Sequence, residues 1–392
     1  MTALGIVAFI VGILISILLH EAGHLVTAKR FGMKATEFFA GFGPRLWSFR
    51  KGETEYGLKA IPAGGYVKIL GMAEEEEIAE EDQPRAFYRQ PGWQRAIVLV
   101  SGSATHFVIA FVLLFVMAAG IGLPHSSLTV GKVIPCVPDG QAVTCEKSDP
   151  AAPAAQAGLQ EGDRIAAFAG EPVDSWEELA SAIQSHGPGK SSLTVVRDGE
   201  RITLHPDLAR SSGGGGFLGM APAAKSVRSG PVDGLVFASD NFAQIMVGTA
   251  KVFAAIPSVI PNLFSADRGE GGPAGGGGVS SVVGIARISG EVFSDVDSWS
   301  RTMLMFFSIM VSVNISVGML NLLPLMPLDG GRLAVLGYER AKAGVFRLRG
   351  RADPGPVDMN KLMPVTSLAL ILIIGFAVLL ILADIFNPLN PL

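Results

Sequence analysis

Four long apolar stretches constrain this chain more than any other feature of its sequence. A transmembrane helix needs roughly 20 consecutive apolar residues, because the hydrocarbon layer is about 30 Å thick. Stretches of this kind lie at residues 3–28, 96–121, 303–323 and 365–385. The composition agrees, since 49% of the residues are hydrophobic and 17% are charged, against about a quarter charged in soluble domains. The sequence therefore predicts a polytopic α-helical membrane protein with four transmembrane helices.

The loops between these stretches differ in charge, and cytoplasmic loops collect Lys and Arg. Residues 29–95 carry 11 Lys and Arg against 10 Asp and Glu, and residues 325–363 carry 7 against 4. Residues 122–302 carry 13 against 19. We therefore expect this last segment and both termini to lie outside the cytoplasm. The net charge of −4 offers no basic stripe for nucleic acid, so the expected partner is the lipid bilayer and not nucleic acid.

The only two cysteines, Cys136 and Cys145, both fall in the segment assigned to the oxidising side of the membrane. They flank a turn-like Pro-Asp-Gly, and disulfides persist on that side. A disulfide that closes this small loop is one interpretation. Two cysteines alone fix no framework, so a pair of free thiols remains the alternative.

The segments outside the spans differ in pattern. Residues 36–72 alternate apolar and polar side chains and are rich in Gly, Pro and aromatics, which is typical of short strands and tight turns. Residues 211–216 are typical of a flexible linker. Residues 232–259 place apolar side chains at helical spacing, which indicates an amphipathic helix near the membrane.

Residues 128–208 carry the pattern of a small soluble α+β domain, with several strand-like runs and one helix-like run. Asp174 or Ser175 can cap that helix. Asp198-Gly199 lies between two strand-like runs and predicts a hairpin turn. We expect an inserted domain of about 80 residues here.

The strongest chemical pattern is His20-Glu21-Ala22-Gly23-His24, at the end of the first apolar stretch. On a helix, positions i and i+4 lie one turn apart on one face, so the two imidazoles can chelate one zinc ion. Glu21 can then take a proton from a water that the metal holds. The motif follows seventeen uncharged residues, and an ionisable group at that depth costs at least about 2.5 kcal/mol. A purely structural role is therefore disfavoured.

A catalytic zinc site uses three protein ligands, so the third should come from another span. The best source is the segment at 321–330, Asn-Leu-Leu-Pro-Leu-Met-Pro-Leu-Asp-Gly. Pro324 and Pro327 break the helix, and broken backbone at membrane depth is tolerated only where it faces protein or a water-filled cavity. We predict Asp329 as the third ligand, the alternative being an acid at a helix end that faces the cytoplasm.

These motifs resemble the site-2 protease family of intramembrane zinc metalloproteases, in particular the bacterial branch that cleaves anti-sigma factors. That family pairs H-E-x-x-H in its first core span with N-x-x-P-x-P-x-L-D-G in its third, and the resemblance covers nearly the whole chain. It implies that His20, His24 and Asp329 bind Zn²⁺ and that Glu21 is the catalytic base. It also implies that Asn321 helps to hold the substrate.

The resemblance extends to the remaining segments. Residues 41–71 look like the family's membrane-reentrant β-loop, whose edge holds the substrate in extended form, and a strand edge can supply the hydrogen bonds that an unwound helix loses. Residues 157–165 are similar to part of the family's PDZ domain, and the chain has room for one such domain. The candidate substrate-binding residues are Asn321, Gly41, Gly43, Pro324 and Pro327.

Together these assignments predict four parts and a location. Residues 1–122 hold the first two spans, the H-E-x-x-H and the reentrant β-loop, and residues 123–210 form the PDZ domain. Residues 211–301 form a linker and the amphipathic helix, and residues 302–392 hold the last two spans and the Asp ligand. The expected location is the bacterial inner membrane, with the PDZ domain and both termini outside the cytoplasm and the active site toward the cytoplasmic side. The sequence assigns no oligomeric state.

Three departures from the family pattern concern the surroundings of the site. Pro327 lies one place late in its motif. In the second span the family commonly has A-G-P followed by Asn, and this chain has Ser-Gly-Ser at 101–103 followed by His106. Before the third span the family often has G-P-V-G, and this chain has Ser-Val-Val-Gly at 281–284. His106 could be a fourth ligand or a proton relay. Because three ligands are already assigned, we favour a histidine that is hydrogen-bonded inside the bundle.

The leading hypothesis is a zinc endopeptidase that cuts the transmembrane segment of a single-span protein, such as an anti-sigma factor already trimmed by another protease. The alternative is a non-catalytic membrane scaffold that binds partners through its PDZ domain, and a metal transporter is a third. A scaffold has no use for Glu21 beside two histidines and Asp329. A transporter would place several acids or histidines along its spans, where this chain adds little beyond His106.

Overall fold

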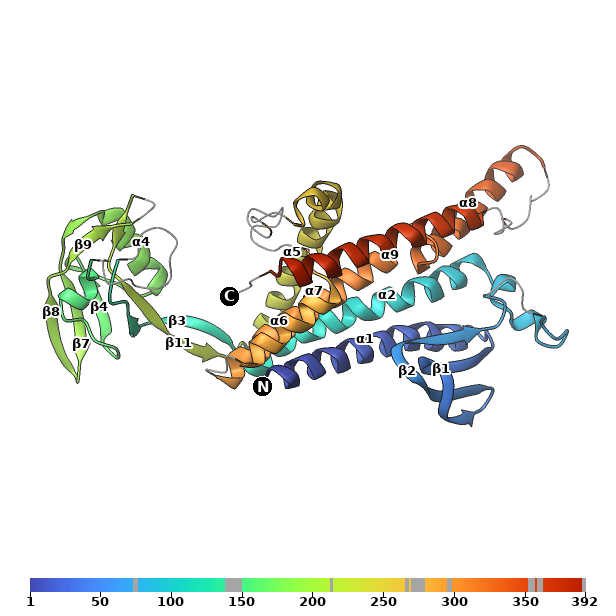
Figure 1. Cartoon of the computed structure of the whole chain (residues 1–392), viewed down its shortest axis with the longest axis horizontal. Helices are drawn as coiled ribbons and strands as arrows, with labels where there is room; N and C mark the ends of the chain where they lie inside the picture. The colour runs from blue at the N-terminus through green and yellow to red at the C-terminus, as the bar shows by residue number, and fades with distance from the viewer. Residues whose placement is uncertain are drawn as a thin grey trace. The chain divides into compact units, whose positions relative to one another are not determined.

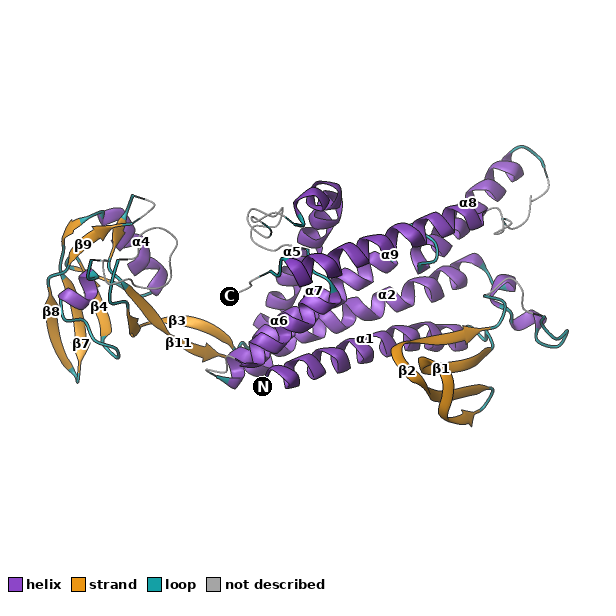
Figure 2. Cartoon of the chain, in the orientation of Figure 1, coloured by secondary structure: helices purple, strands orange, loops and turns teal. Residues whose placement is uncertain are grey.

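The computed structural model describes most of the chain, namely residues 1–72, 77–137, 150–211, 214–264, 268, 279–294, 298–351, 357 and 362–389. The chain forms two compact units (Figure 1). The first combines Met1–Ile121 with Gly230–Leu392, and we call it the membrane unit. The second is Gly122–Ser229, which we call the β unit because strands dominate it (Figure 2).

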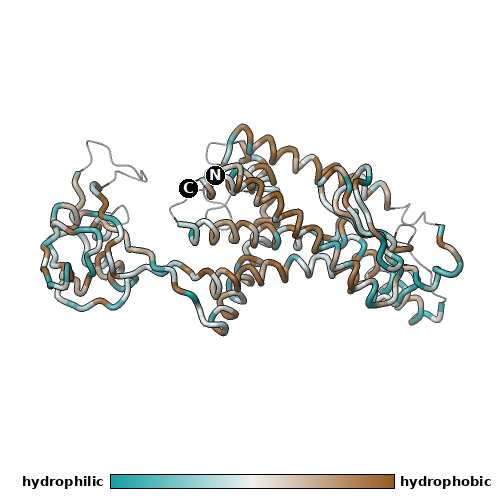
Figure 3. Tube along the Cα trace, turned by 90° about the horizontal axis from the view of Figure 1, so that it is seen from below, coloured by the Kyte–Doolittle hydropathy of each residue, from teal (hydrophilic) through white to brown (hydrophobic). Residues whose placement is uncertain are grey.

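Four helices in the described part of the membrane unit are long and apolar enough to cross a membrane. They are α1 (Thr2–Arg30), α2 (Gly92–Phe115) with its π-helical continuation η3 (Val116–Ile121), α7 (Trp299–Asn321) and α9 (Met363–Phe386). Hydrophobic residues follow these helices along their length (Figure 3). They coincide with the four predicted stretches, so the prediction of a polytopic helical membrane protein is confirmed.

Three of these spans, α1, α2 and α7, pack together. α2 contacts α1 and α7, and α1 also contacts the shorter helix α6 (Val282–Ser294). Phe9 of α1 is fully buried and packs against Met310 and Val313 of α7. α5 (Pro231–Val259) packs on α2, so a helix does form where helical spacing predicted one, and the short turn η4 (Ile260–Asn262) follows it.

Between α1 and α2 the chain forms an antiparallel hairpin of β1 (Ala35–Lys51) and β2 (Thr54–Ile69). The sequence predicted short strands and turns here, but two strands of 17 and 16 residues form. Gly41 and Gly43 have φ values of 83° and 82°. They bend β1 and shift its register without ending it, which explains the difference.

The base of the hairpin is buried, and part of β1 is exposed. Met33 and Ile69 belong to a core cluster that includes Leu25 of α1 and Val98 of α2, so the base is fixed to the bundle. Leu46, Trp47 and Phe49 of β1 are exposed. The turns η1 (Gln83–Arg85) and η2 (Phe87–Arg89) lead on to α2.

The β unit contains only antiparallel strand pairs among its described residues. Its larger sheet has the order β11-β3-β4-β7-β8, with β5 paired to β4, and a smaller sheet has the order β10-β9-β6. The strands are β3 (Leu123–Val133), β4 (Arg164–Phe168), β5 (Glu171–Pro172), β6 (Gly189–Lys190), β7 (Leu193–Arg197), β8 (Glu200–Leu204), β9 (Asp207–Arg210), β10 (Gly216–Phe217) and β11 (Met220–Val227).

Two helices complete this unit, the short α3 (Pro153–Gln156) and α4 (Trp176–His186). Of the two predicted caps of α4, Ser175 is the one used, because its side chain accepts a hydrogen bond from the amide of Glu178. Leu179 and Ile183 of α4 are buried in the core of the unit.

The β unit extends beyond the predicted end at residue 210. β10 pairs with β9, and β11 pairs with β3 along most of its length, so the compact unit continues to Ser229. The glycines at 214–216 suggested a linker, but Gly216 forms part of a strand. Cys145 lies outside the described residues, so its pairing with Cys136 stays a prediction.

Candidate metal centre

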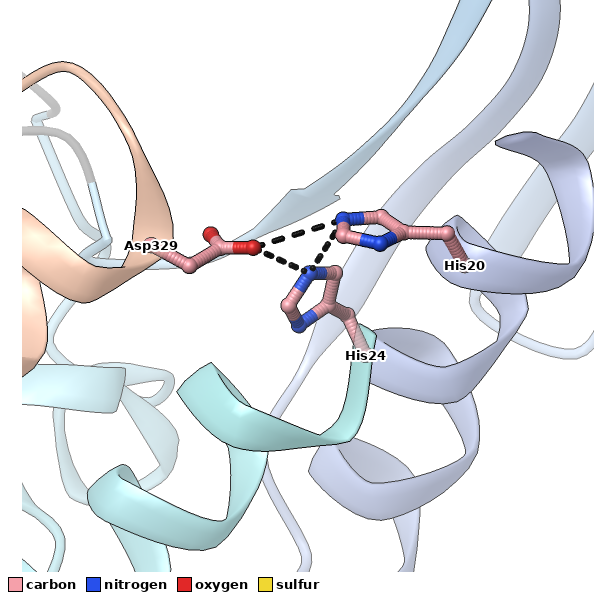
Figure 4. Close-up of side chains that lie close together, drawn as sticks. All are labelled: His20, His24 and Asp329. Atoms are coloured by element: carbon pink, nitrogen blue, oxygen red, sulfur yellow. Dashed lines mark hydrogen bonds and ion pairs between the residues drawn. The ribbon is translucent and has the colours of Figure 1, made fainter. Parts of the chain in front are cut away.

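Two histidines of α1 and the first residue of α8 (Asp329–Leu348) meet inside the membrane unit (Figure 4). The Nε2 atoms of His20 and His24 lie 3.1 Å apart. Asp329 Oδ2 lies 3.3 Å from His20 Nε2 and 3.2 Å from His24 Nε2. Both histidines are buried. Among the described residues, this is the only group of three or more His, Cys, Asp or Glu that could hold a metal ion.

The triangle of ligand atoms has the size that zinc requires. A tetrahedral zinc ion with ligands at about 2.0–2.1 Å separates neighbouring ligand atoms by about 3.3–3.4 Å. The observed separations of 3.1, 3.2 and 3.3 Å are close to this value. Two imidazole nitrogens and one carboxylate oxygen are also a donor set of catalytic zinc sites, which leave the fourth position open.

The orientation of His24 is fixed from its other side. Its Nδ1 lies 2.7 Å from the carbonyl oxygen of Val98 on α2. Because a carbonyl oxygen only accepts hydrogen bonds, Nδ1 must carry the proton, which leaves the Nε2 lone pair for the metal. Such a partner behind a ligand histidine is usual in metal sites. His20 differs, since its Nδ1 is buried and has no hydrogen-bond partner in the structure.

Gly102 lets α2 approach both histidines, and the sequence did not single it out as a site residue. A Cβ atom at this position would lie 2.4 Å from His24 Nε2 and 2.6 Å from His20 Nε2. Any side chain at position 102 would therefore occupy the space between the ligands. The sequence did contain one clue, because Gly102 stands between Ser101 and Ser103 in a span that is otherwise rich in larger apolar residues.

Asp329 reaches the histidines because the chain turns sharply between α7 and α8. α7 ends at Asn321, and residues 322–328 are not helical, as the two prolines predicted. Gly330 makes the turn possible, since a Cβ atom there would lie 2.3 Å from the carbonyl oxygen of Leu322. The prediction that Asp329 joins the two histidines is thus consistent with the observed geometry.

Glu21 connects the metal-binding group to the hairpin. Its Oε2 accepts a hydrogen bond of 3.0 Å from the backbone amide of Val67 on β2. The carboxylate also interacts electrostatically with His20, His24 and Asp329. The hairpin therefore holds the predicted catalytic base in place.

The predicted substrate-binding residues lie in two places. Asn321 is the last residue of α7, and Pro324 and Pro327 lie in the turn that leads to Asp329. Gly41 and Gly43 lie on β1, and a Cβ atom at Gly41 would meet the carbonyl oxygen of Ile61 on β2 at 2.6 Å. This contact accounts for Gly41 structurally. A role of these five residues in binding substrate stays a prediction.

His106 lies on α2, close to the metal-binding group but not in it. Its Nδ1 lies 2.8 Å from Asn314 Oδ1 on α7, and its ring centroid lies 5.1 Å from that of His20. Both His106 and Asn314 are buried. The favoured interpretation, a histidine hydrogen-bonded inside the bundle, agrees with this bond.

Comparison with known proteins gives consistent results along the whole chain. The sequence model of "Peptidase family M50" matches residues 8–350. The zinc metalloprotease Rip1 of Mycobacterium tuberculosis is 36% identical over 405 residues, which cover 98% of each chain. Rip1 of Mycolicibacterium smegmatis is 35% identical over 414 residues, 100% of this chain and 99% of the relative. A putative zinc metalloprotease of a Nostoc species is 30% identical over 97% of this chain and 96% of its own.

Proposed function

The chain belongs to peptidase family M50, the site-2 protease family, and from this membership we propose how its residues cut a peptide bond inside a membrane. It is an intramembrane zinc metalloprotease with His20, His24 and Asp329 as its metal-binding group, and its substrates are membrane proteins. The observation that carries the proposed chemistry is the triangle of three ligand atoms, 3.1–3.3 Å apart. When bound, zinc supplies a Lewis acid that polarises the scissile carbonyl and makes water more acidic.

Glu21 is the general base in this proposal. It follows His20 directly on α1, so its carboxylate lies beside the ligands without being one of the three. The hydrogen bond from Val67 orients the carboxylate. Glu21 accepts the proton of the attacking water and later gives it to the leaving amine, as a carboxylate of a zinc peptidase does.

The hairpin presents the substrate. A transmembrane helix shields its own peptide bonds, so the substrate must unwind, and its freed amides and carbonyls then need partners. β1 and β2 form a two-stranded sheet in which residues 37–40 of β1 pair with β2 on both sides, so the open edges beside them belong to β2 and can add an extended peptide. β2 also touches Glu21 through Val67, which supports binding at this edge. Asn321, Gly41, Gly43, Pro324 and Pro327 line the path of the substrate in this proposal.

The hairpin is membrane-reentrant in this proposal. Leu46 and Trp47 of β1 are 64% and 60% exposed, which suits contact with lipid better than contact with water. The β unit is a PDZ domain outside the cytoplasm, where it filters substrates by size or reads a newly made end. The difference in loop charge supports this side of the membrane.

The substrate class follows from the resemblance to the bacterial branch of the family. We assign single-span proteins of the anti-sigma-factor type, already trimmed on their outer side by another protease. The test is to reconstitute the purified protein with a panel of such spans, with and without a zinc chelator. Wild-type protein should cut at least one span only when zinc is present, and Glu21→Gln should keep zinc and fail to cut.

Two outcomes would contradict parts of this proposal separately. Normal cleavage by Glu21→Gln would remove Glu21 as the base but keep the substrate class. No cleavage of any panel member by zinc-loaded wild-type protein, in conditions where an unrelated unwound span is cut, would remove the substrate class. For orientation, Ser185→Cys should react with an impermeant thiol reagent in intact cells and Arg89→Cys should not, in a background without Cys136 and Cys145.

A further inference from the structure

The second half of α8 carries an exposed apolar stripe that no part of the described chain covers. Tyr338, Ala341, Val345 and Leu348 follow one another at helical spacing of three and four residues, so they lie on one face. Tyr338 is 59% exposed, Val345 is 45% exposed and Leu348 is 90% exposed. The first half of α8 is different, because Leu333 and Leu336 pack in the core cluster that fixes the hairpin.

The exposed half of α8 is also rich in cations. Residues 330–351 contain six Lys and Arg and one acid, Glu339. Glu339 is already engaged, since it lies 3.5 Å from Arg95 of α2 and accepts a hydrogen bond from the amide of residue 357. At 100° per residue, Lys342 and Arg349 lie beside the stripe, whereas Arg340 and Arg347 lie farther round the helix. The exposed half of α8 is therefore both apolar and positively charged.

The connectivity of the chain keeps α8 at one face of the membrane. The span before it, α7, ends at Asn321, and the span after it, α9, begins at Met363. Both ends of the connecting segment therefore lie at the same membrane surface, whichever side that is. Figure 1 shows α8 at the end of the bundle where α2 and α9 begin. An exposed apolar stripe with cations beside it, at that level, matches a helix that contacts an anionic lipid surface.

We propose that the second half of α8 is a docking site for anionic lipid headgroups, and that this docking steadies the helix whose first residue is Asp329. The cations at 342, 347 and 349 bind the phosphate groups, and Leu348 enters the boundary between headgroups and acyl chains. Because α8 begins at a metal ligand, lipid contact at its other end limits the movement of that ligand. The lipid composition then affects how firmly the metal is held.

Hydrogen–deuterium exchange of the full-length protein tests the lipid contact directly. The protein is placed in nanodiscs of phosphatidylcholine alone and of phosphatidylcholine with phosphatidylglycerol, and peptides covering residues 337–351 are compared. Each cation near an anionic surface changes the docked population by about fivefold, so we expect at least tenfold slower exchange in the anionic discs. At 1 M salt, where charges are screened beyond about 3 Å, the difference should largely disappear.

Matched variants separate lipid docking from net charge. Lys342→Gln, Arg347→Gln and Arg349→Gln together should abolish the difference between the two lipids. Arg164→Gln, Arg201→Gln and Arg210→Gln remove the same charge from exposed positions of the β unit and should leave it intact. Equal exchange of the wild-type protein in both lipids, or equal loss in both triple variants, would overturn the proposal.

Release of zinc to a chelator tests the connection to Asp329. We expect wild-type protein to release zinc several-fold more slowly in anionic discs, and the α8 triple variant to release it equally fast in both. Slower exchange of α8 without any change in zinc release would overturn the connection between lipid and ligand. The connection would also be overturned if the β-unit triple variant lost the lipid effect on zinc release to the same extent as the α8 triple variant.

Discussion

The membrane unit and the β unit bury opposite kinds of side chain. Among the described residues, the β unit buries one polar side chain, Asp163, and exposes one large apolar side chain, Val227, while its core is aliphatic and aromatic. The membrane unit exposes large apolar residues along α1, α2 and α9 and buries His20, His24 and His106. The two units therefore distribute polarity in opposite ways.

This difference follows from the solvent that each unit faces. In lipid, an exposed Leu or Val costs nothing, so apolar side chains are free to face outward, and the few polar groups must find partners inside. In water, burial of apolar surface stabilises the fold, at about 25 cal/mol per Å². Substitutions of buried residues should therefore change chemistry in the membrane unit and stability in the β unit. Substitutions in each unit test that division.

The largest effect is expected for Asp329→Ala. Two remaining protein ligands hold zinc poorly, so the purified variant should lack the metal, and cleavage should fall at least as far as the roughly 10²–10⁴-fold expected for a lost general base. Mass spectrometry measures the metal content, and cleavage of a panel span measures the activity; both should fall together. The β unit should keep its wild-type unfolding curve, because it contributes no ligand.

A contrary result would relocate the site. If Asp329→Ala keeps full zinc and near-normal cleavage, the third ligand lies elsewhere. His106 would then be the first residue to test, because its ring lies 5.1 Å from that of His20.

A smaller but still large effect is expected for Gly102→Ala. The added methyl group would lie 2.4 Å from His24 Nε2, so the histidine or α2 must move. Displacing a ligand through its surroundings costs roughly 10–100-fold in metal affinity, measurable by competition with a chelator. Gly375→Ala is the matched control, since a Cβ atom at Gly375 in α9 has nothing within 4 Å. Equal zinc affinity in both variants would mean that α2 does not constrain the ligands.

The parts of the site that sequence could predict depend on local spacing. His20 and His24 are four residues apart on one helix, and this spacing alone brings them to one face. Asp329 was predictable because the broken helix around Pro324 and Pro327 needs a polar environment at membrane depth. The four spans were predictable for the same kind of reason, since length and apolarity act within one segment.

The parts that sequence missed depend on contacts between segments. Gly102 and the carbonyl of Val98 matter because α2 crosses α1 at His24. Val67 matters because β2 passes beside Glu21. Likewise, the glycines at 214–216 suggested a linker, and only the pairing of β10 with β9 makes Gly216 part of a sheet. No periodicity within one segment contains this information.

In the β unit, Leu179→Ala should change stability and leave the metal site unchanged. Leu179 of α4 is fully buried in the core of the unit. Removing such a side chain costs about 2–5 kcal/mol. Urea unfolding followed by the fluorescence of Trp176, with the other tryptophans replaced by Phe, measures this cost. Ser185→Ala, at an exposed position of the same helix, is the control. Loss of zinc in Leu179→Ala would contradict the division between the two units.

The smallest effect concerns Asp163, the one buried polar side chain of the described β unit. Arg197 donates two hydrogen bonds of 2.7 Å to its two carboxylate oxygens, and the amide of Gln160 donates a third of 2.9 Å. The Arg197 guanidinium, more than offsetting the effect of burial, holds the pKa of Asp163 below its ordinary value. A carboxyl with a lowered pKa stabilises the folded state fully above its unfolded pKa of about 3.9. That contribution is lost as the pH falls through the lower, folded value.

We therefore expect the stability of the β unit to fall as the pH is lowered below about 4, measured by the same Trp176 fluorescence in urea. Asp163→Asn keeps the shape but removes the charge, so it should lower stability at pH 7 by less than Leu179→Ala does. The stability of this variant should also depend less on pH than the stability of the wild-type protein does. Asp207→Asn, at an exposed position of β9, should do neither. If Asp163→Asn leaves the acid-induced loss unchanged, other carboxyl groups cause it, and the single buried charge of the β unit has no measurable role in its stability.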